Sequence, residues 1–229
     1  MKIAGLQKTT LLDYPGKVAC TVFLSGCNFR CPFCQNGEIL DAGVCGMAEE
    51  EFFSFLERRR GLLDGVCVSG GEPLVHADIA PFFEKIKKLG YAVKLDTNGS
   101  FPDRLKALAE AKLVDFVAMD IKNSPEKYEK TAGAPVDLQK IRESAAFLMD
   151  GGAEYEFRTT VVKELHRGED MVRIGQWLKG AKRYFLQNFR DSDAVLRRGL
   201  TPFADEELEA FKRLLLPYIP NAKIRGEQT

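Results

Sequence analysis

The sequence predicts an α/β fold built on a parallel sheet, and three observations lead to this prediction. Short apolar runs alternate with amphipathic stretches of helical period along the chain. Six such strand–helix pairs follow one another, which favours parallel strands joined by right-handed helical crossovers. The chain has 229 residues, 45% of them hydrophobic, and can therefore bury a large core. Six units fit either a doubly wound sheet or an incomplete barrel of the TIM type.

The units can be placed in order along the chain. Apolar runs rich in β-branched and aromatic residues predict strands at 18–24, 66–69, 91–95, 116–119, 155–162 and 184–188. Apolar residues at helical spacing predict helices at 48–60, 79–89, 103–111, 138–149, 168–179 and 206–216. Prolines at 217 and 220 end the last helix, and residues 221–229 are expected to form a short strand or tail. No linker or fixed-period repeat divides the pattern, so we expect residues 1–229 to form a single domain.

The charge balance and the N-terminal sequence argue against several classes of protein. The 33 basic and 33 acidic residues cancel, so no overall field favours nucleic acid or an anionic membrane surface. The uncharged stretch at 18–29 is well short of the roughly 20 apolar residues that span a bilayer. Residues 1–8 contain no apolar core of signal-peptide length. We therefore expect a cytoplasmic protein with reduced thiols, and no membrane or nucleic-acid partner.

The most informative motif is a cysteine triplet directly after the first predicted strand. Cys27, Cys31 and Cys34 follow a C-x3-C-x2-C spacing. Iron–sulfur cubanes normally have four cysteine ligands, so a triplet without a nearby fourth cysteine leaves one iron free to bind another molecule. Zinc remains the alternative, although zinc motifs usually contain two ligand pairs and neither histidine is close in sequence. Disulfides do not suit a cytoplasmic chain.

Glycines and polar residues also follow the later strands, where parallel α/β proteins carry their chemistry. The segment Ser-Gly-Gly-Glu-Pro at 69–73 has two glycines that let a ligand approach the backbone. Asp120 and Lys122 stand on one side of an extended backbone. The candidate residues at these strand ends are Gly70, Gly71, Glu72, Asp96, Thr97, Asp120, Lys122, Arg158, Gln187 and Asn188. Turn formation, helix capping and an internal ion pair are their alternative explanations.

Taken together, these residues resemble the radical S-adenosylmethionine (SAM) superfamily. Within it, the chain is most similar to the proteins that activate glycyl radical enzymes, such as anaerobic ribonucleotide reductase and pyruvate formate-lyase. The resemblance covers nearly the whole chain. It rests on the triplet with Phe33 before its last cysteine, on the Gly-Gly-Glu-Pro segment, and on Leu-Asp-Tyr-Pro-Gly-Lys at 12–17. The chain departs from the usual His-Asn-Pro after the third cysteine, because it has Gln35-Asn36-Gly37 there. This departure leaves the local turn and the partner specificity open.

The resemblance implies an incomplete (β/α)6 TIM-like barrel with parallel strands, one 4Fe-4S cluster and SAM as cofactor. Cys27, Cys31 and Cys34 would bind three irons, and SAM would chelate the fourth. Phe33 would border the adenine. The residues expected to line the methionyl amino group are Gly70, Gly71 and Glu72.

The same resemblance assigns roles on the carboxylate side of SAM. Asp96, Thr97 and Asp120 would shape the polar pocket around the methionine carboxylate and the ribose, together with a monovalent cation. Lys122 and Arg158 would supply positive charge to the carboxylate. This pocket would hold the cofactor in place while its sulfonium is reduced.

The resemblance also implies the activity. A one-electron donor such as flavodoxin or ferredoxin would reduce the cluster, and reductive cleavage of SAM would give methionine and a 5′-deoxyadenosyl radical. That radical would take a hydrogen atom from a glycine of a partner glycyl radical enzyme. Two alternatives remain open: a radical SAM enzyme that acts on a small molecule or modified nucleoside, and a non-catalytic iron–sulfur or zinc module.

The remaining cysteines and histidines are expected to be structural. Cys20 and Cys67 fall within apolar strands and are predicted to be small core residues, whereas Cys45 falls in a loop. The chain has no further run of cysteines, so we expect a single cluster. His76 and His166 are predicted to be surface or loop residues, because hydrogen-atom abstraction needs no proton relay.

Overall fold

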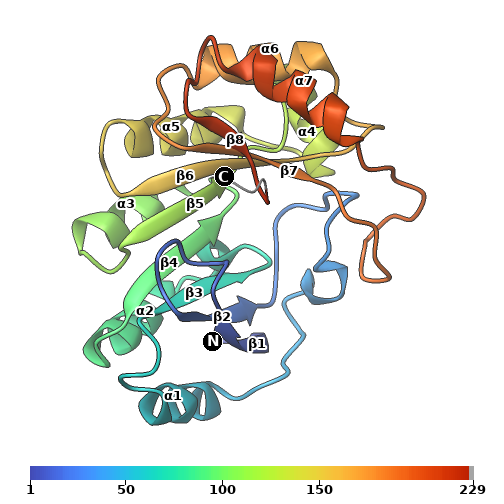
Figure 1. The fold of residues 1–229 in the computed structure, drawn as a ribbon. Helices are drawn as coiled ribbons and strands as arrows, with labels where there is room; N and C mark the ends of the chain where they lie inside the picture. The colour runs from blue at the N-terminus through green and yellow to red at the C-terminus, as the bar shows by residue number, and fades with distance from the viewer. Residues whose placement is uncertain (227–229) are drawn as a thin grey trace.

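The computed structural model describes residues 1–226 and contains one eight-stranded sheet (Figure 1). The strands lie in chain order across it. They are β1 Ile3–Thr10, β2 Ala19–Leu24, β3 Gly65–Gly70, β4 Ala92–Thr97, β5 Phe116–Asp120, β6 Tyr155–Val161, β7 Tyr184–Asn188 and β8 Ala222–Ile224. β1 is antiparallel to β2, and every other neighbouring pair is parallel. β1 and β8 are the two edges of the sheet, so the barrel does not close, as the sequence predicted.

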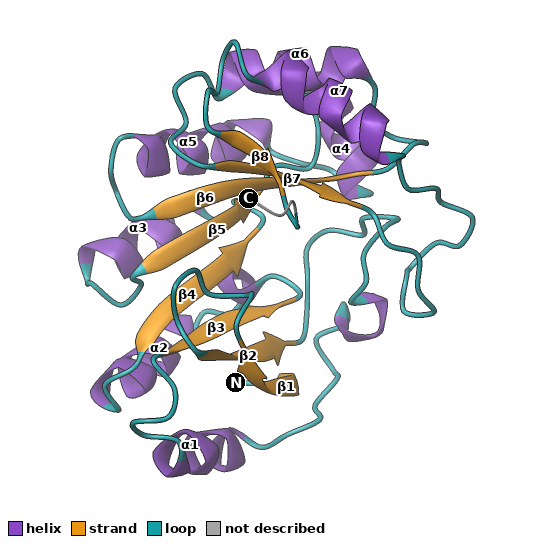
Figure 2. Ribbon diagram, viewed as in Figure 1, coloured by secondary structure: helices purple, strands orange, loops and turns teal. Residues whose placement is uncertain are grey.

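Helices cover the outer face of the curved sheet, as Figure 2 shows. Those within the described residues are α1 Glu49–Arg58, α2 Ile79–Lys88, α3 Pro102–Glu110, α4 Tyr128–Ala132, α5 Leu138–Met149, α6 Gly168–Trp177 and α7 Asp205–Leu215. Short 3-10 turns follow three of the strands, at Gly37–Ile39, Pro73–Val75 and Pro125–Lys127. The inner, concave face is thereby left for a ligand.

The six predicted strands and the six predicted helices are all present, with ends that move by at most two residues. The sequence analysis missed β1 and α4. β1 is an edge strand whose middle residues are exposed, so it lacks a continuous apolar run. α4 has only five residues, too few to show a helical period. β8 confirms the short strand expected near the C-terminus, and residues 227–229 of that prediction lie outside the described residues.

The apolar core lies between the sheet and its helices. α2 shows the pattern most clearly, because its buried residues recur every three or four positions, at Ile79, Phe82, Phe83 and Ile86. Phe82 stacks on Phe52 of α1 with ring centroids 5.6 Å apart. Burying each such side chain contributes about 1.5–3 kcal/mol to folding. Cys20 belongs to this core, as predicted.

The inside of the barrel is polar. Successive residues of a strand point to opposite faces, and along β4 Val93 and Leu95 belong to the apolar core. Lys94 and Asp96 face the other way and form an ion pair inside the barrel. Cys67 of β3 lies 3.7 Å from the Lys94 ammonium. This cysteine is fully buried, as predicted for a small core residue, and its sulfur lies beside a charge.

The loop after β2, which carries the cysteine triplet, rests on the end of α4. The backbone N–H of Arg30 donates to the carbonyl of Ala132 over 2.8 Å. Gly133 ends α4 with a φ of 65°, in the left-handed region that favours glycine. A Cβ at this position would overlap the carbonyl group of Arg30. Glycine is therefore required both by the helix end and by the close approach of the cysteine loop.

Replacing Gly133 by alanine is expected to lower the free energy of unfolding by about 3 kcal/mol, because it adds a steric clash to the backbone strain. Gly61→Ala is the matched control. Gly61 has a φ of 75° and open space around it, so only the backbone strain remains, about 1 kcal/mol. Denaturant unfolding of both variants tests the prediction. Equal losses would show that the cysteine loop does not press on the end of α4.

Candidate active site

A cavity of about 540 Å³ opens at the carboxyl ends of the parallel strands. Its volume lies in the range of about 300–1,000 Å³ that is usual for small-molecule sites. The three cysteines of the triplet line it together with residues at the carboxyl ends of β3, β4 and β5 and residues of β6 and β7. The strand-end residues singled out in the sequence therefore meet at one place, as expected for a parallel α/β fold.

The cysteine loop is held from several sides. Cys31 is buried, whereas Cys27 and Cys34 are partly exposed toward the cavity. The N–H of Leu196, in the loop after β7, donates to the carbonyl of Cys34 over 3.0 Å. The backbone N–H of Phe29 donates to the Cys27 sulfur over 3.4 Å. These contacts fix the backbone that positions the three thiols.

Burial raises the pKa of Cys27 and Cys31 and so keeps these two thiols protonated when no metal is bound. It raises the pKa of Cys27 to about 12, against a backbone hydrogen bond that favours the thiolate. Burial also raises the pKa of Cys31, and the positive charge of Lys122 partly offsets that effect. Metal binding must therefore release protons from these residues. The positive charge of Lys122 favours this release at Cys31.

The donor set fits an iron–sulfur cluster better than a single metal ion. Cys27, Cys31 and Cys34 line one cavity, and thiolates are the usual ligands of iron–sulfur clusters. Among residues 1–226, no three His, Cys, Asp or Glu side chains lie close enough together to share one metal ion. A cluster instead offers each thiolate its own iron and spreads the sulfurs apart.

The glycine segment after β3 presses against the cysteine loop. The Asn36 side chain donates to the carbonyl of Gly70 over 2.9 Å, and the N–H of Glu72 donates to the carbonyl of Gly26 over 2.8 Å. A Cβ at Gly71 would overlap the backbone of Gly26. The asparagine that follows the third cysteine therefore joins the two motifs, although its neighbours depart from the usual family sequence.

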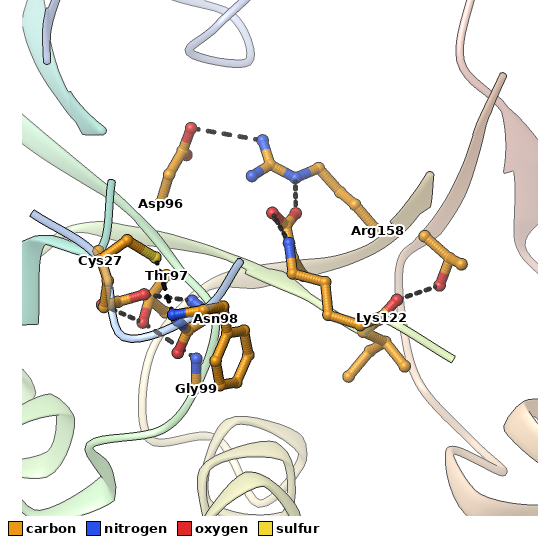
Figure 3. Close-up of polar contacts among 12 residues, drawn as sticks. Cys27, Asp96, Thr97, Asn98, Gly99, Lys122 and Arg158 are labelled. Carbon is orange, nitrogen blue, oxygen red and sulfur yellow. Dashed lines mark hydrogen bonds and ion pairs between the residues drawn. The ribbon is translucent and has the colours of Figure 1, made fainter. Parts of the chain in front are cut away.

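Glu72 lies behind the cavity wall, which corrects the prediction that it lines the ligand site. Only 1% of the residue is exposed. Its Oε1 accepts hydrogen bonds from the N–H of Leu74 and the hydroxyl of Thr97, over 3.0 and 2.8 Å. Its Oε2 accepts one from the N–H of Asn98 over 2.6 Å. Glu72 thus ties the glycine segment to the loop after β4, which lies beside Cys27 (Figure 3).

A network of charged side chains forms the opposite wall. Asp120 accepts from Arg158 Nε over 2.9 Å and from the Lys122 ammonium over 3.0 Å. Arg158 also reaches Asp96 over 3.5 Å (Figure 3). Lys94 donates to the other oxygen of Asp96. Three cationic side chains therefore face two carboxylates, which leaves this wall with one net positive charge.

All five members of the network stay ionised. Burial alone would raise the pKa of Asp120, but Arg158 and Lys122 outweigh it and hold that pKa well below its usual range. Burial opposes the charge of Asp96 in the same way, and Arg158 and Lys94 outweigh it. Burial would also lower the pKa of Lys122, and Asp120 raises it instead. The wall can therefore hold an anionic group of a ligand at neutral pH.

The structure gathers the other predicted site residues around this cavity. Those that line it are Cys27, Cys31, Phe33, Cys34, Gly70, Gly71, Asp96, Thr97, Asp120, Lys122, Arg158, Gln187 and Asn188. The side-chain amide of Asn188 is bonded to the backbone of Phe203 and so serves the fold.

Sequence reasoning missed several residues of this site. The missed lining residues include Asp13, Asn98, Glu156, Arg190 and Arg225. Lys94, which lies under the cavity, had a sequence signal, because a lysine between Val93 and Leu95 interrupts an apolar strand as Arg158 does.

The histidines do not belong to the site. His166 is in a loop, as predicted, and it is fully buried. Its Nε2 lies 2.9 Å from the carbonyl oxygen of Lys122. His76 is partly buried in a loop, with Nε2 at 2.8 Å from the carbonyl oxygen of Ser25. Cys45 is exposed in a loop, as predicted.

An open parallel barrel with three thiols at its strand ends, beside a ligand-sized cavity, defines an iron–sulfur enzyme that binds a second small molecule. Comparison with known proteins agrees with this class. Residues 21–174 match the model of the radical SAM superfamily, which covers more than half of the chain. The chain belongs to this superfamily, whose members use SAM and a 4Fe-4S cluster.

Comparison with individual relatives shows which members of the superfamily the chain is similar to. A Methanocaldococcus jannaschii protein that carries the name glycyl-radical enzyme activating enzyme is 30% identical over 230 residues, which cover 97% of this chain and 95% of the relative. Pyruvate formate-lyase-activating enzyme from Streptococcus mutans is 29% identical over 79% of this chain and 74% of its own. A shorter match, 32% identical over 48% of this chain, is to 7-carboxy-7-deazaguanine synthase from Methanopyrus kandleri, 51% of which is covered.

A solved structure shows the same fold. Streptococcus suis SuiB bound to S-adenosylmethionine superposes with a TM-score of 0.68 at 15% identity. The match covers 90% of this chain and 52% of SuiB, so the chain spans about half of that protein. Within the described residues, no helix combines the length and the apolar character needed to cross a membrane.

Glu72→Gln tests the role of the buried carboxylate that lies behind the cavity wall. Burial raises the pKa of Glu72 from 4.5 to about 7, against three hydrogen bonds that favour the ionised form. A carboxyl with a higher pKa in the folded state stabilises the fold while protonated. That contribution is complete below the unfolded value and is lost as pH rises through about 7.

The wild type should therefore lose up to about 3 kcal/mol of stability relative to Glu72→Gln between pH 4.5 and 8. Denaturant unfolding at both pH values measures this change. If the stability of the wild type relative to Glu72→Gln stayed constant or rose with pH, the result would contradict the buried position of the carboxyl.

Proposed function

We propose that this chain installs a glycyl radical on a partner enzyme of the anaerobic ribonucleotide reductase or pyruvate formate-lyase type. The observation that carries the proposal is the match over 97% of the chain to a relative named for this activity. The match to a pyruvate formate-lyase-activating enzyme, over 79% of the chain, supports it further. The cysteine loop and the ligand cavity at the strand ends are consistent with this chemistry.

In this proposal the three cysteines hold the cluster and leave one iron for SAM. When bound, the two groups together supply a carbon radical that can remove a hydrogen atom from a glycine Cα. The chain's own residues place the ligands and exclude water, because such a radical attacks most C–H bonds within reach. Phe33 is proposed to border the adenine, and Gly70 and Gly71 to receive the methionyl amino group.

The charged wall is proposed to receive the methionine carboxylate. Lys122 and Arg158 carry the positive charge that would attract this anion, and both line the cavity. Asp96 and Asp120 hold them in place through the ion pairs described above. Thr97 lines the same part of the cavity while its hydroxyl is bonded to Glu72. This arrangement orients the cofactor through a charge that is already fixed by the fold.

Exposed apolar side chains at the rim of the cavity favour a protein as the substrate. Leu12 lines the cavity, yet 83% of it is exposed, and its neighbour Leu11 is 71% exposed. Exposed apolar side chains beside a cavity are typical of surfaces that bind another protein. The sheet ends at β1, the strand just before these leucines, so no further strand closes the barrel at that edge. A glycine-bearing loop of a partner could enter there.

Further parts of the proposal concern conditions and partners. We propose flavodoxin or ferredoxin as the electron donor, and the reducing cytoplasm as the compartment, because the cluster needs one electron per turnover and free thiols. The near-zero net charge argues against a nucleic-acid substrate. The monovalent cation implied by the family resemblance stays outside the proposal, since the negative charges of Asp96 and Asp120 are already paired with lysine and arginine side chains.

A second candidate function is a radical SAM reaction on a small molecule, supported by the match to 7-carboxy-7-deazaguanine synthase. That match covers 48% of the chain, against 97% for the activating-enzyme relative. The activating function is therefore preferred. Partner activation, described below, separates the two.

Alanine at Cys27, Cys31 or Cys34 is expected to abolish cluster binding and SAM cleavage, because each residue is assigned one iron. Cys67→Ala should retain both, since its thiol lies beside Lys94 inside the barrel. Iron and sulfide content, and the yield of 5′-deoxyadenosine under reducing conditions, measure the two effects. Loss of the cluster in Cys67→Ala would show that the ligand assignment is wrong.

Incubation of the reduced, SAM-loaded protein with a glycyl radical enzyme should produce the doublet EPR signal of a glycyl radical. The protein has to be reconstituted with iron and sulfide under anaerobic conditions, and Cys31→Ala serves as the control. Every glycyl radical enzyme of the source organism should be included. If none of them gives the doublet signal while SAM is still cleaved, the small-molecule alternative would be supported instead.

A further inference from the structure

Lys94 is the one member of the charged network that does not line the cavity. It stands on β4 under the cavity floor, and 1% of it is exposed. A buried ammonium without a partner would be strongly destabilising, so its position depends on Asp96. Lys94 donates to Oδ1 of Asp96 and lies 3.7 Å from the sulfur of Cys67. Its role must therefore be exerted through Asp96.

All four carboxylate oxygens of the network have donors. Asp96 Oδ1 accepts from Lys94, and its Oδ2 accepts from the Ser69 hydroxyl over 3.0 Å. Asp120 Oδ1 accepts from Arg158, and its Oδ2 accepts from Lys122. Asp96 is thereby paired with the buried Lys94 ammonium as well as with Arg158. A sodium or potassium ion placed against Asp96 would meet the positive charge of Lys94, which disfavours the monovalent cation that the family resemblance implies.

We propose that the Lys94 ammonium takes the place of a monovalent cation, which makes the SAM site of this chain independent of sodium and potassium. An ammonium group carries the same charge as these ions. Because it belongs to a side chain of the protein, it does not have to bind from solution. The proposal rests on the function proposed above only in placing the SAM carboxylate at this wall. Lys94 is then a positioning residue that keeps Asp96 neutralised and the wall positive.

The charge balance explains why the lysine matters. With Lys94 present, the wall keeps one net positive charge beside the site proposed for the carboxylate. Without Lys94 the network of Asp96, Asp120, Lys122 and Arg158 would be neutral overall, and Asp96 would repel the carboxylate. A small cation that enters the vacated space would restore the original charge.

The first experiment uses the wild-type protein with its cluster reconstituted anaerobically. Equilibrium dialysis measures SAM affinity in choline, sodium, potassium and ammonium chloride at constant ionic strength. The proposal predicts affinities that agree within about twofold across the four salts. A gain of about tenfold or more in sodium or potassium would overturn it, because it would reveal a separate cation site.

The second experiment compares Lys94→Ala with Lys94→Met. In choline both should bind SAM about tenfold more weakly than the wild type, the cost of one lost charge near the carboxylate. Ammonium or potassium should restore affinity in Lys94→Ala, where the shorter side chain leaves room for an ion. Lys94→Met should not respond, because its side chain fills that room. Ammonium should likewise raise the melting temperature of Lys94→Ala alone.

Lys106→Ala is the control for general salt effects. Lys106 is paired with Glu143 on the surface, so its loss should change neither SAM affinity nor its dependence on cations. Wild-type affinity of Lys94→Ala in choline would overturn the proposal, as would equal rescue of the alanine and methionine variants. SAM binding requires no partner protein. A failure to activate any glycyl radical enzyme would therefore not contradict the role of Lys94. Likewise, a SAM affinity that contradicts the role of Lys94 would not contradict partner activation.

Discussion

The placement of five charged side chains inside the barrel, where Lys94 is buried and the other four are partly buried, is the constraint on which the site depends. Charges in such a place must be paired, and their pairing requires one strand register. Asp120 of β5 is the direct neighbour of Arg158 of β6 in the parallel ladder. A shift of one residue would turn either side chain into the apolar layer under the helices. The ion pairs therefore specify the register of β4, β5 and β6, while the packing of the helices stabilises the fold as a whole.

The cysteine loop is attached to this frame at three points that come from different parts of the chain. Asn36 bonds to Gly70 at the end of β3, Arg30 rests on the end of α4, and Cys34 accepts from Leu196 after β7. Glu72 in turn ties the glycine segment to the loop after β4. Each half of the open barrel thus contributes to holding the thiols. This explains how eight residues of loop, without regular structure, can present three ligands to one cluster.

The sequence was sufficient for most of the architecture and for the cavity wall. Alternating apolar runs locate the buried strands, and motifs at strand ends converge because parallel strands end at one edge. Edge strand β1 and the short α4 lack that signal. Glu72 shows a different limit: a motif shows that a residue matters, but not whether its side chain faces the ligand or the fold. Lys94 could have been suspected from its apolar neighbours, yet its partner on the same strand becomes evident only when the inside of the barrel is known.

The proposal that three cysteines leave one iron open to SAM is tested most directly by Mössbauer spectroscopy of the reconstituted protein. Spectra are recorded with and without SAM under anaerobic conditions. The structure predicts that SAM changes the environment of about a quarter of the cluster iron, the one site of about four that has no cysteine ligand. Iron that is wholly unaffected by SAM would contradict an open iron at this site.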